Sequence, residues 1–158
     1  IDTRNFMNRT GVRTFEAAAF LRTCGADITR VRKMFRDDMA SYRAKAEAVR
    51  MAEVYREQYA IAVCPSNIES PTVLAAQAAN ELLDISGIKA SFVLTIYEGK
   101  IYMSARSIDE VNVQIIAEKL GGGGHINSAG AQFDHTNMDE AISALKETID
   151  KMIEEGDI

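Results

Sequence analysis

The change of residue pattern at Tyr59 limits the fold of this chain more than any other feature of its sequence. Before Tyr59, apolar residues recur at helical spacing. After it, short apolar runs of strand length alternate with amphipathic segments of helix length. The resulting order of elements, β-α-β-β-α-β-α, predicts an α/β fold in which helices pack on a mixed β-sheet.

Turn and capping residues give approximate bounds for these elements. Ser70-Pro71 marks a helix start, because Ser accepts hydrogen bonds from free N–H groups and Pro suits the first helical position. Glu98-Gly99 fits a hairpin turn. The predicted strands lie at residues 60–64, 90–97, 100–106 and about 129–133, and the predicted helices at 71 to about 86, 113–120 and about 138–154.

Two helices are predicted before the change of pattern. Thr14 is a candidate N-cap for a short helix that Gly25 ends. Over residues 28–57, apolar residues recur at steps of three and four and form one helical stripe. At this length the stripe predicts a connecting helix between two lobes, and a solvated structural helix fits it equally well.

Charge is divided unevenly along the chain, whose net charge is −5. Residues 1–58 contain 12 Lys or Arg against 8 Asp or Glu, whereas residues 59–158 contain 6 against 15. Long nucleic acids are held by basic faces, so the second part is not expected to bind them. No apolar run approaches the roughly 20 residues of a membrane helix, so no membrane contact is expected. Cys24 and Cys64 are predicted to be reduced thiols.

Four successive glycines followed by a histidine form the strongest candidate site. Glycines remove every Cβ and expose backbone N–H groups, so a ligand's phosphates or sugar can approach the main chain. The histidine can donate to a phosphate or stack on a base. Flexible linkers are also glycine-rich, but they join separate bodies, whereas this run interrupts a compact strand–helix pattern. We therefore predict a ligand-binding loop at Gly121, Gly122, Gly123, Gly124 and His125.

A second candidate group lies where the predicted hairpin ends. Arg106 is one of six basic residues in the last hundred, and its planar guanidinium suits bidentate phosphate recognition. A surface salt bridge is the alternative, and the neighbouring glycine run makes it the weaker one. Ser107 offers a hydroxyl but also fits a capping box with Glu110. We assign Ser104, Arg106 and Asn112 to substrate binding together with the glycine run.

The sequence contains no recognisable metal site or complete catalytic centre. His125 and His135 are the only histidines. There is no two-histidine helix pair, cysteine cluster, serine nucleophile elbow or Walker loop. This chain is therefore not expected to assemble a catalytic centre alone.

Three segments resemble one protein family. The string SARSIDEVNVQIIAEKLGGGGHINSAGAQF closely resembles the signature of the DHHA1 domain, the substrate-binding lobe of DHH phosphodiesterases. The preceding SPTVLAAQAANELLDISGIKASFVLTIYEGKIYMSARS resembles the upstream part of that domain in bacterial cyclic di-AMP phosphodiesterases. The opening IDTRNFMNRTGVRTFEAAAFLRTCGAD resembles the end of their DHH domain. Many relatives carry two alanines where this sequence has Ser128-Ala129, a difference of one hydroxyl.

The resemblance implies a C-terminal remnant of a DHH domain at residues 1–27, a connecting helix at 28–58 and a DHHA1 substrate-binding domain at 59–158. An Asp of the family's DT-x-x-F motif, matched by Asp2 ahead of Phe6, is one ligand of a two-manganese centre. The other ligands lie upstream in the family and are absent from this sequence. One carboxylate cannot hold two divalent ions, so Mn²⁺ is expected in the parent enzyme and not on this chain alone.

The resemblance further implies that the parent hydrolyses cyclic di-AMP to pApA and that this chain is its nucleotide-binding lobe, inactive by itself. The expected partner is cyclic di-AMP or another short adenine dinucleotide, and the expected location is the cytoplasm, with the parent anchored through other segments. An oligoribonuclease or a 3′-phosphoadenosine 5′-phosphate phosphatase of the same superfamily is one alternative. A non-catalytic nucleotide-binding or dimerisation module is another, and a homodimer stays open.

Overall fold

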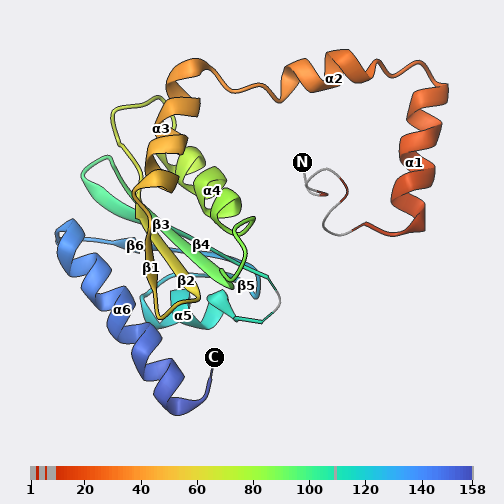
Figure 1. Ribbon diagram of the computed structural model, residues 1–158. Helices are drawn as coiled ribbons and strands as arrows, with labels where there is room; N and C mark the ends of the chain where they lie inside the picture. The colour runs from red at the N-terminus through yellow and green to blue at the C-terminus, as the bar shows by residue number, and fades with distance from the viewer. Residues whose placement is uncertain (1–2, 4–5, 7–9, 109, 158) are drawn as a thin grey trace. The chain divides into compact units, whose positions relative to one another are not determined.

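The structure, a computed structural model, describes residues 3, 6, 10–108 and 110–157 (Figure 1). It divides into two compact units, residues 1–37 and residues 38–158. The second unit contains the whole sheet. Within the described part of the chain, no helix is both long and apolar enough to cross a membrane.

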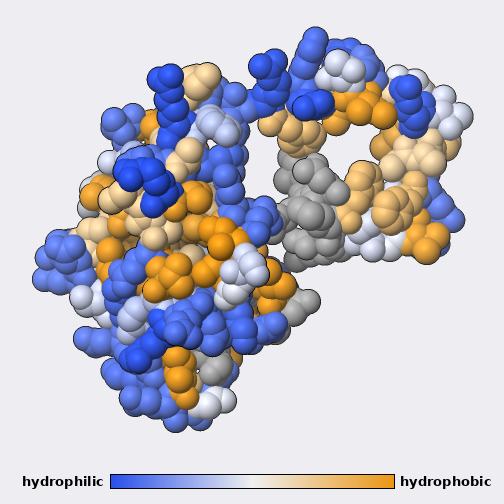
Figure 2. Space-filling model, in the orientation of Figure 1, coloured by the Kyte–Doolittle hydropathy of each residue, from blue (hydrophilic) through white to orange (hydrophobic). Residues whose placement is uncertain are grey.

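The first unit contains two helices that bury none of their own residues. They are α1 at Val12–Thr23 and α2 at Ile28–Met34. Apolar side chains of this unit lie on its surface (Figure 2). Thr14, the predicted N-cap, lies inside the first turn of α1, where its hydroxyl accepts a hydrogen bond from the Gly11 N–H at 3.3 Å. The helix therefore begins before the predicted cap.

The connecting helix predicted over residues 28–57 is not continuous. α2 is followed by a separate helix, α3, at Met39–Arg50. Asp38 starts α3, because its carboxylate accepts a hydrogen bond from the Ala40 N–H at 2.8 Å. The spacing of apolar residues misses such a break, because an Asp side chain competes for backbone N–H groups whatever the neighbouring side chains are.

The end of that predicted helix is a strand. β1 spans Glu53–Tyr55 and pairs antiparallel with β2, which spans Tyr59–Val63. The turn between them uses Arg56 and Glu57 in the left-handed region, at φ 48° and 63°. Arg56 also donates two hydrogen bonds of 2.9 Å to the carboxylate of Asp150, which ties this turn to the C-terminal helix.

The sheet has six strands in the order β1-β2-β3-β4-β6-β5. Only β2 and β3 pair in parallel, and the other neighbours are antiparallel. The mixed sheet predicted from the order of elements is confirmed. The remaining strands are β3 at Ala90–Tyr97, β4 at Lys100–Ser107, β5 at Gly123–His125 and β6 at Ser128–Phe133.

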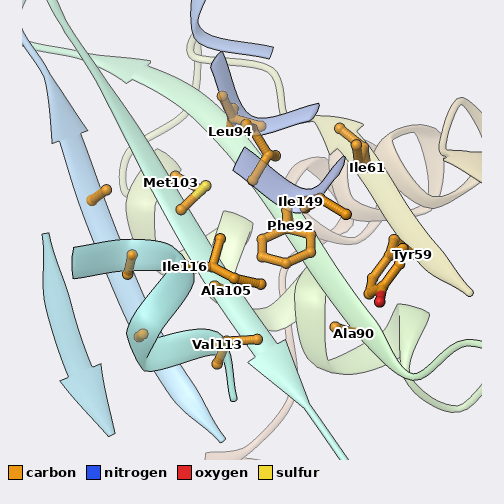
Figure 3. Close-up of a cluster of buried hydrophobic side chains, with 14 of the residues drawn as sticks. Tyr59, Ile61, Ala90, Phe92, Leu94, Met103, Ala105, Val113, Ile116 and Ile149 are labelled. Atoms are coloured by element: carbon orange, nitrogen blue, oxygen red, sulfur yellow. The ribbon is translucent and has the colours of Figure 1, made fainter. Parts of the chain in front are cut away.

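Helices cover the two faces of the sheet differently (Figure 1). On one face, here called the α6 face, α5 and α6 bury a continuous apolar cluster in which Phe92 of β3 lies among side chains of β2, β4, α5 and α6 (Figure 3). On the other, the α4 face, α3 and α4 bury a smaller cluster over β2 and β3 that includes Cys64 and Val93. The bounds are α4 at Pro71–Leu82, α5 at Val113–Lys119 and α6 at Met138–Glu155.

Both cysteines are free thiols, as the sequence predicts. Cys24 is exposed and Cys64 is buried. Burial raises the pKa of the Cys64 thiol to about 11, so this thiol stays protonated near neutral pH.

Candidate functional site

The α4 face is covered over β2 and β3, is partly covered over β4, which α4 also contacts, and opens over β6 and β5. Along β4, buried side chains on the α6 face alternate with half-buried ones on the α4 face. Side chains of directly paired residues lie on the same side of a sheet, so the register across β4, β6 and β5 identifies the members of this open face. They are Tyr102, Ser104, Arg106, Gly123, His125, Ser128, Gly130 and Gln132.

The predicted arginine and histidine lie in one cross-strand row of this open face. Arg106 on β4 pairs with Ser128 on β6, and Ser128 pairs with His125 on β5. Ser128 and His125 are exposed and Arg106 is half-buried. The row therefore presents a guanidinium, a hydroxyl and an imidazole from three adjacent strands, which is a set of donors suited to a phosphate.

The next row consists mainly of backbone. Ser104 pairs with Gly130, and Gly130 pairs with Gly123. Two of these three residues have no side chain, so the main chain of β6 and β5 is uncovered there. A ligand held by the first row can approach this backbone closely.

The four glycines of the run have different structural roles. Gly121 has φ 79° and ends α5. The N–H of Gly121 donates to the carbonyl of Glu118, and the N–H of Gly122 donates to the carbonyl of Ala117, which together form a Schellman motif. A Cβ on Gly122 would lie 2.6 Å from the Cα of Ala131. Both glycines are therefore required by the fold.

The last two glycines of the run contrast with each other. Gly124 has φ 148°, and a Cβ there would lie 2.5 Å from the carbonyl oxygen of Ser128. A Cβ on Gly123 would meet nothing within 4 Å. Gly123 is thus the member of the run whose missing side chain the fold does not explain, and it is the one that lies in the uncovered row.

Hydrogen bonds fix the turn that carries His125. The hydroxyl of Ser107 donates to the carbonyl of Ile126 at 3.3 Å, and its backbone N–H donates to the carbonyl of Asn127 at 3.2 Å. The N–H of Val113 donates to the same Ile126 carbonyl at 3.0 Å. The start of α5 and the end of β4 therefore hold the β5–β6 turn in place.

The cap of α5 is not the predicted one. Asn112 is the N-cap, and its Oδ1 accepts a hydrogen bond from the Gln114 N–H at 3.1 Å. Ser107 lies too far upstream, because α5 begins at Val113, so the predicted capping box with Glu110 is not formed. Asn112 thus has a structural role, and its assignment to substrate binding stays a prediction.

Four lysines of the last hundred residues form salt bridges with carboxylates. The partners are Glu110 for Lys89, Asp134 for Lys100, Glu155 and Asp157 for Lys119, and Glu53 for Lys146. The hydrogen bond from Lys89 to Glu110, 2.8 Å long, raises the pKa of that lysine. Arg106 donates from Nη1 to the carbonyl of Ala105 at 2.8 Å. Among the members of the open face, Arg106 is the permanent cation.

The described residues do not form a metal centre. They contain no group of three or more His, Cys, Asp or Glu side chains placed to hold a metal ion. Asp2, the ligand that the family resemblance implies, lies outside the described residues. No catalytic step through Mn²⁺ can be derived from this part of the chain.

Comparison with known proteins matches the DHHA1 domain to residues 56–151, which contain every predicted substrate-binding residue. This chain belongs to the DHHA1 domain family. Cyclic-di-AMP phosphodiesterase PdeA of Listeria monocytogenes is 42% identical over 151 residues, or 95% of this chain and 23% of that protein. Cyclic-di-AMP phosphodiesterase GdpP of Bacillus subtilis is 43% identical over 159 residues, or 99% and 24%. The DHHA1 chain thus spans about a quarter of the length of these relatives.

Solved structures share the fold. An exopolyphosphatase-related protein from Bacteroides fragilis superposes with a TM-score of 0.82 at 22% identity, covering 95% of this chain and 46% of that one. The pGpG-specific phosphodiesterase PggH from Vibrio cholerae gives 0.51 at 15% identity, covering 90% and 52%. At these identities the likeness establishes the architecture alone.

The structure brings half of the predicted binding residues of this DHHA1 chain together on the open face. Ser104, Arg106, Gly123 and His125 share the open face, whereas Asn112 caps α5. Four further members, Tyr102, Ser128, Gly130 and Gln132, were not predicted. The spacing of two between Tyr102, Ser104 and Arg106 is a signal that identifies Tyr102, since alternate strand residues share a face. Ser128 and Gly130 follow only from the pairing of β6.

Proposed function

We propose that this chain is the nucleotide-binding lobe of a larger phosphodiesterase that hydrolyses cyclic di-AMP to pApA. The observation that carries the proposal is the row of Arg106, Ser128 and His125 beside the uncovered backbone of Gly123 and Gly130. A planar guanidinium can donate two parallel hydrogen bonds to phosphate oxygens, and the neighbouring hydroxyl and imidazole can add further donors. The identity to cyclic di-AMP phosphodiesterases over nearly the whole chain supports this substrate.

The lobe in this proposal binds and orients the phosphodiester and does not itself activate water. The Mn²⁺ that would supply a metal-bound nucleophile is assigned to a DHH domain of the same protein, to which Asp2 would contribute one ligand. The described residues offer no alternative metal cluster. The cytoplasm is the proposed location of the lobe.

The surface of the first unit supports the proposed DHH remnant at residues 1–27. Phe15 and Phe20 of α1 are 56% and 67% exposed, and no residue of the helix is buried. Amphipathic and apolar helices are stable mainly when packing covers their apolar side chains. A DHH domain is the cover that the family membership suggests.

Calorimetric titration with cyclic di-AMP, pApA and AMP, with and without Mn²⁺, tests the binding site. We expect saturable, weak binding of the dinucleotides without metal and its loss in Arg106→Ala. Lys151→Ala removes the same charge from an exposed site on α6 and should leave binding unchanged. Equal effects of the two substitutions, or unchanged binding in Arg106→Ala, would contradict the proposed phosphate site.

A further inference from the structure

The turn between β1 and β2 has an unusual backbone conformation for its sequence. Two consecutive residues of this turn, Arg56 and Glu57, have positive φ, at 48° and 63°. Hairpin turns with two positive φ values usually use Asn-Gly or Asp-Gly, because a Cβ is disfavoured in the left-handed region. The β3–β4 turn has glycine at its second such position, since Glu98 at φ 50° is followed by Gly99 at φ 76°. The β1–β2 turn therefore carries backbone strain that the β3–β4 turn avoids.

The segment before this strained turn, α3 and β1, lies at the edge of the sheet. β1 is the first strand in the sheet order and pairs with β2. α3 packs on α4, where Ala48 is buried and Lys45 forms a salt bridge with Glu81 at 3.5 Å. Because β1 is an edge strand, α3 and β1 can separate from the rest of the second unit without breaking the pairing between any other two strands.

The contacts of this segment do not require that the turn be closed within one chain. Glu53 of β1 accepts two hydrogen bonds of 2.8 Å from Lys146 of α6, and the hydroxyl of Tyr55 donates to Asp150 at 2.8 Å. The ammonium group of Lys146 also lies 5.1 Å from the centroid of the Tyr55 ring. A second copy of the chain presents the same partners, so these contacts and the β1–β2 pairing can also form between two chains.

We propose that two copies of this chain exchange α3 and β1 and form a domain-swapped dimer, with the Arg56–Glu57 turn as the hinge. In this dimer, β1 of each copy pairs with β2 of the other, and α3 packs on the other copy's α4. Each turn opens into an extended connection, so Arg56 and Glu57 leave the left-handed region. A short hinge loop under strain favours exchange, because monomer and dimer share the contacts of the exchanged segment.

The hydrogen bonds of the closed turn oppose the exchange. Arg56 donates two hydrogen bonds of 2.9 Å to Asp150, and the Gln58 N–H donates to the Tyr55 carbonyl across the turn at 3.3 Å. The balance between these bonds and the backbone strain sets the fraction of dimer. Glu57 is the position at which this balance can be altered, because its side chain is exposed.

Three substitutions of Glu57 change the hinge in different ways. Glu57→Gly tolerates positive φ and should weaken dimerisation about tenfold or more. Glu57→Pro fixes φ at about −65°, which excludes the closed turn and should drive the chain into the dimer. Glu57→Gln removes the charge but keeps the Cβ, so it should match the wild type. Size-exclusion chromatography with light scattering, over a series of protein concentrations, measures the four equilibria.

A disulfide between β1 and β2 identifies the chain that supplies each strand. Val54 and Ala60 are directly paired, and the Cα atoms of such pairs lie at a separation that a disulfide spans. Val54→Cys and Ala60→Cys are combined with Cys24→Ser, which removes the exposed native thiol. After oxidation, denaturing gels without reductant should show single chains from the monomer fraction and linked pairs of chains from the dimer fraction.

Three results would overturn the exchange. A dimer fraction that yields only single chains on the gel would mean that two copies associate through another surface. Wild type and Glu57→Pro that both stay monomeric at every concentration would exclude a swapped dimer. Equal dimer content in the wild type and Glu57→Gly would contradict the hinge, and this comparison holds even if thermal unfolding shows that Glu57→Pro does not fold.

Discussion

Alternate residues of β4 and β6 differ strongly in burial, because their side chains lie on opposite faces of the sheet. On the α6 face, the side chains of Met103, Ala105, Ala129 and Ala131 are all buried, at 7% exposure or less. On the opposite side, the side chains of Ser104, Arg106, Ser128 and Gln132 are half-buried or exposed. One face is closed by α5 and α6, whereas α3 and α4 cover the other over β2 and β3 and reach only part of β4.

Along β4 and β6, odd-numbered residues should therefore determine stability and even-numbered residues should determine ligand recognition. A buried position must match the volume of its neighbours, because protein interiors are closely packed. A position on the open face is less tightly packed, so its side chain can contact a ligand. Substitutions on the α6 face should therefore change the free energy of unfolding, and those on the open face should change binding.

The largest effect is expected for Phe92→Ala, at the centre of the α6 face. Phe92 is 0% exposed, and its removal leaves a cavity bounded by β4, α5 and α6. Such substitutions cost about 3–5 kcal/mol in the free energy of unfolding. Urea denaturation measures this cost.

Ser104→Ala is the matched control for the open face. Its free energy of unfolding should stay within about 0.5 kcal/mol of the wild type, as for surface substitutions that break no special interaction. If Ser104→Ala were as costly as Phe92→Ala, the two faces would not differ in the way proposed.

The glycine run allows the same comparison within neighbouring residues. Gly122→Ala places a Cβ 2.6 Å from the Cα of Ala131, and backbone cannot yield as a flexible side chain can. We expect a loss of about 2–3 kcal/mol, typical of overpacking. Gly123→Ala meets no atom within 4 Å. It should leave the unfolding free energy nearly unchanged and weaken cyclic di-AMP binding, because the methyl group occupies the uncovered row.

Chemical denaturation measures the stability of the two alanine variants, and titration measures their affinity for cyclic di-AMP. A stable Gly122→Ala protein would contradict the packing role of Gly122. Unchanged ligand affinity in Gly123→Ala would mean that the open row does not face the ligand.

The parts of the fold with strong local signals were predictable from the sequence. The β3–β4 hairpin has a Glu98-Gly99 turn, and both residues adopt positive φ. α6 follows the predicted bounds within one residue at each end, because it has a full capping box at Asn137 and a regular apolar stripe. In contrast, β1 and β5 have three residues each, too few to display a period of two. β5 consists of Gly123, Gly124 and His125, whose strand propensity is poor, so tertiary pairing with β6 decides its structure.

The candidate site was predictable residue by residue but not as an arrangement. The glycine run and Arg106 stand out because few other groups in the last hundred residues can serve a phosphate. That Arg106 and His125 share a row depends on β6 lying between β4 and β5, and on the register that places Ser128 between them. Sheet order and register arise from contacts that are distant in sequence, which no local pattern reports.

A smaller effect is expected where the open face meets the end of β4. Ser107→Ala removes the hydroxyl that donates to the Ile126 carbonyl at 3.3 Å. The loss should be about 1 kcal/mol, the usual net value of one hydrogen bond, because Val113 still donates to the same carbonyl. Ser107→Thr keeps the hydroxyl and should restore stability. Since the turn carries His125, ligand binding should weaken in Ser107→Ala, and unchanged binding would limit Ser107 to a structural role.

The smallest effect concerns the edge of the α6 face, where α6 is tied to β1 by polar groups. Hydrogen bonds from Arg56 and from the Tyr55 hydroxyl lower the pKa of the Asp150 carboxyl. A carboxyl whose folded-state pKa is lowered stabilises the protein at pH values above its unfolded-state pKa, and this contribution is lost as the pH falls through the folded-state value.

Asp150→Asn should therefore lower the Tm at pH 7 by a small amount, since exposed ion pairs contribute little. The difference from the wild type should begin to shrink below about pH 4, where an unfolded Asp becomes protonated, and should vanish only as the pH falls through the lower folded-state pKa. Thermal scans from pH 7 to pH 3 measure it, with Arg56→Gln as the matched variant that removes the cation instead. A difference that persists undiminished at pH 3 would mean that Asp150 acts through packing, as the side chains of the α6 face do, and not through its charge.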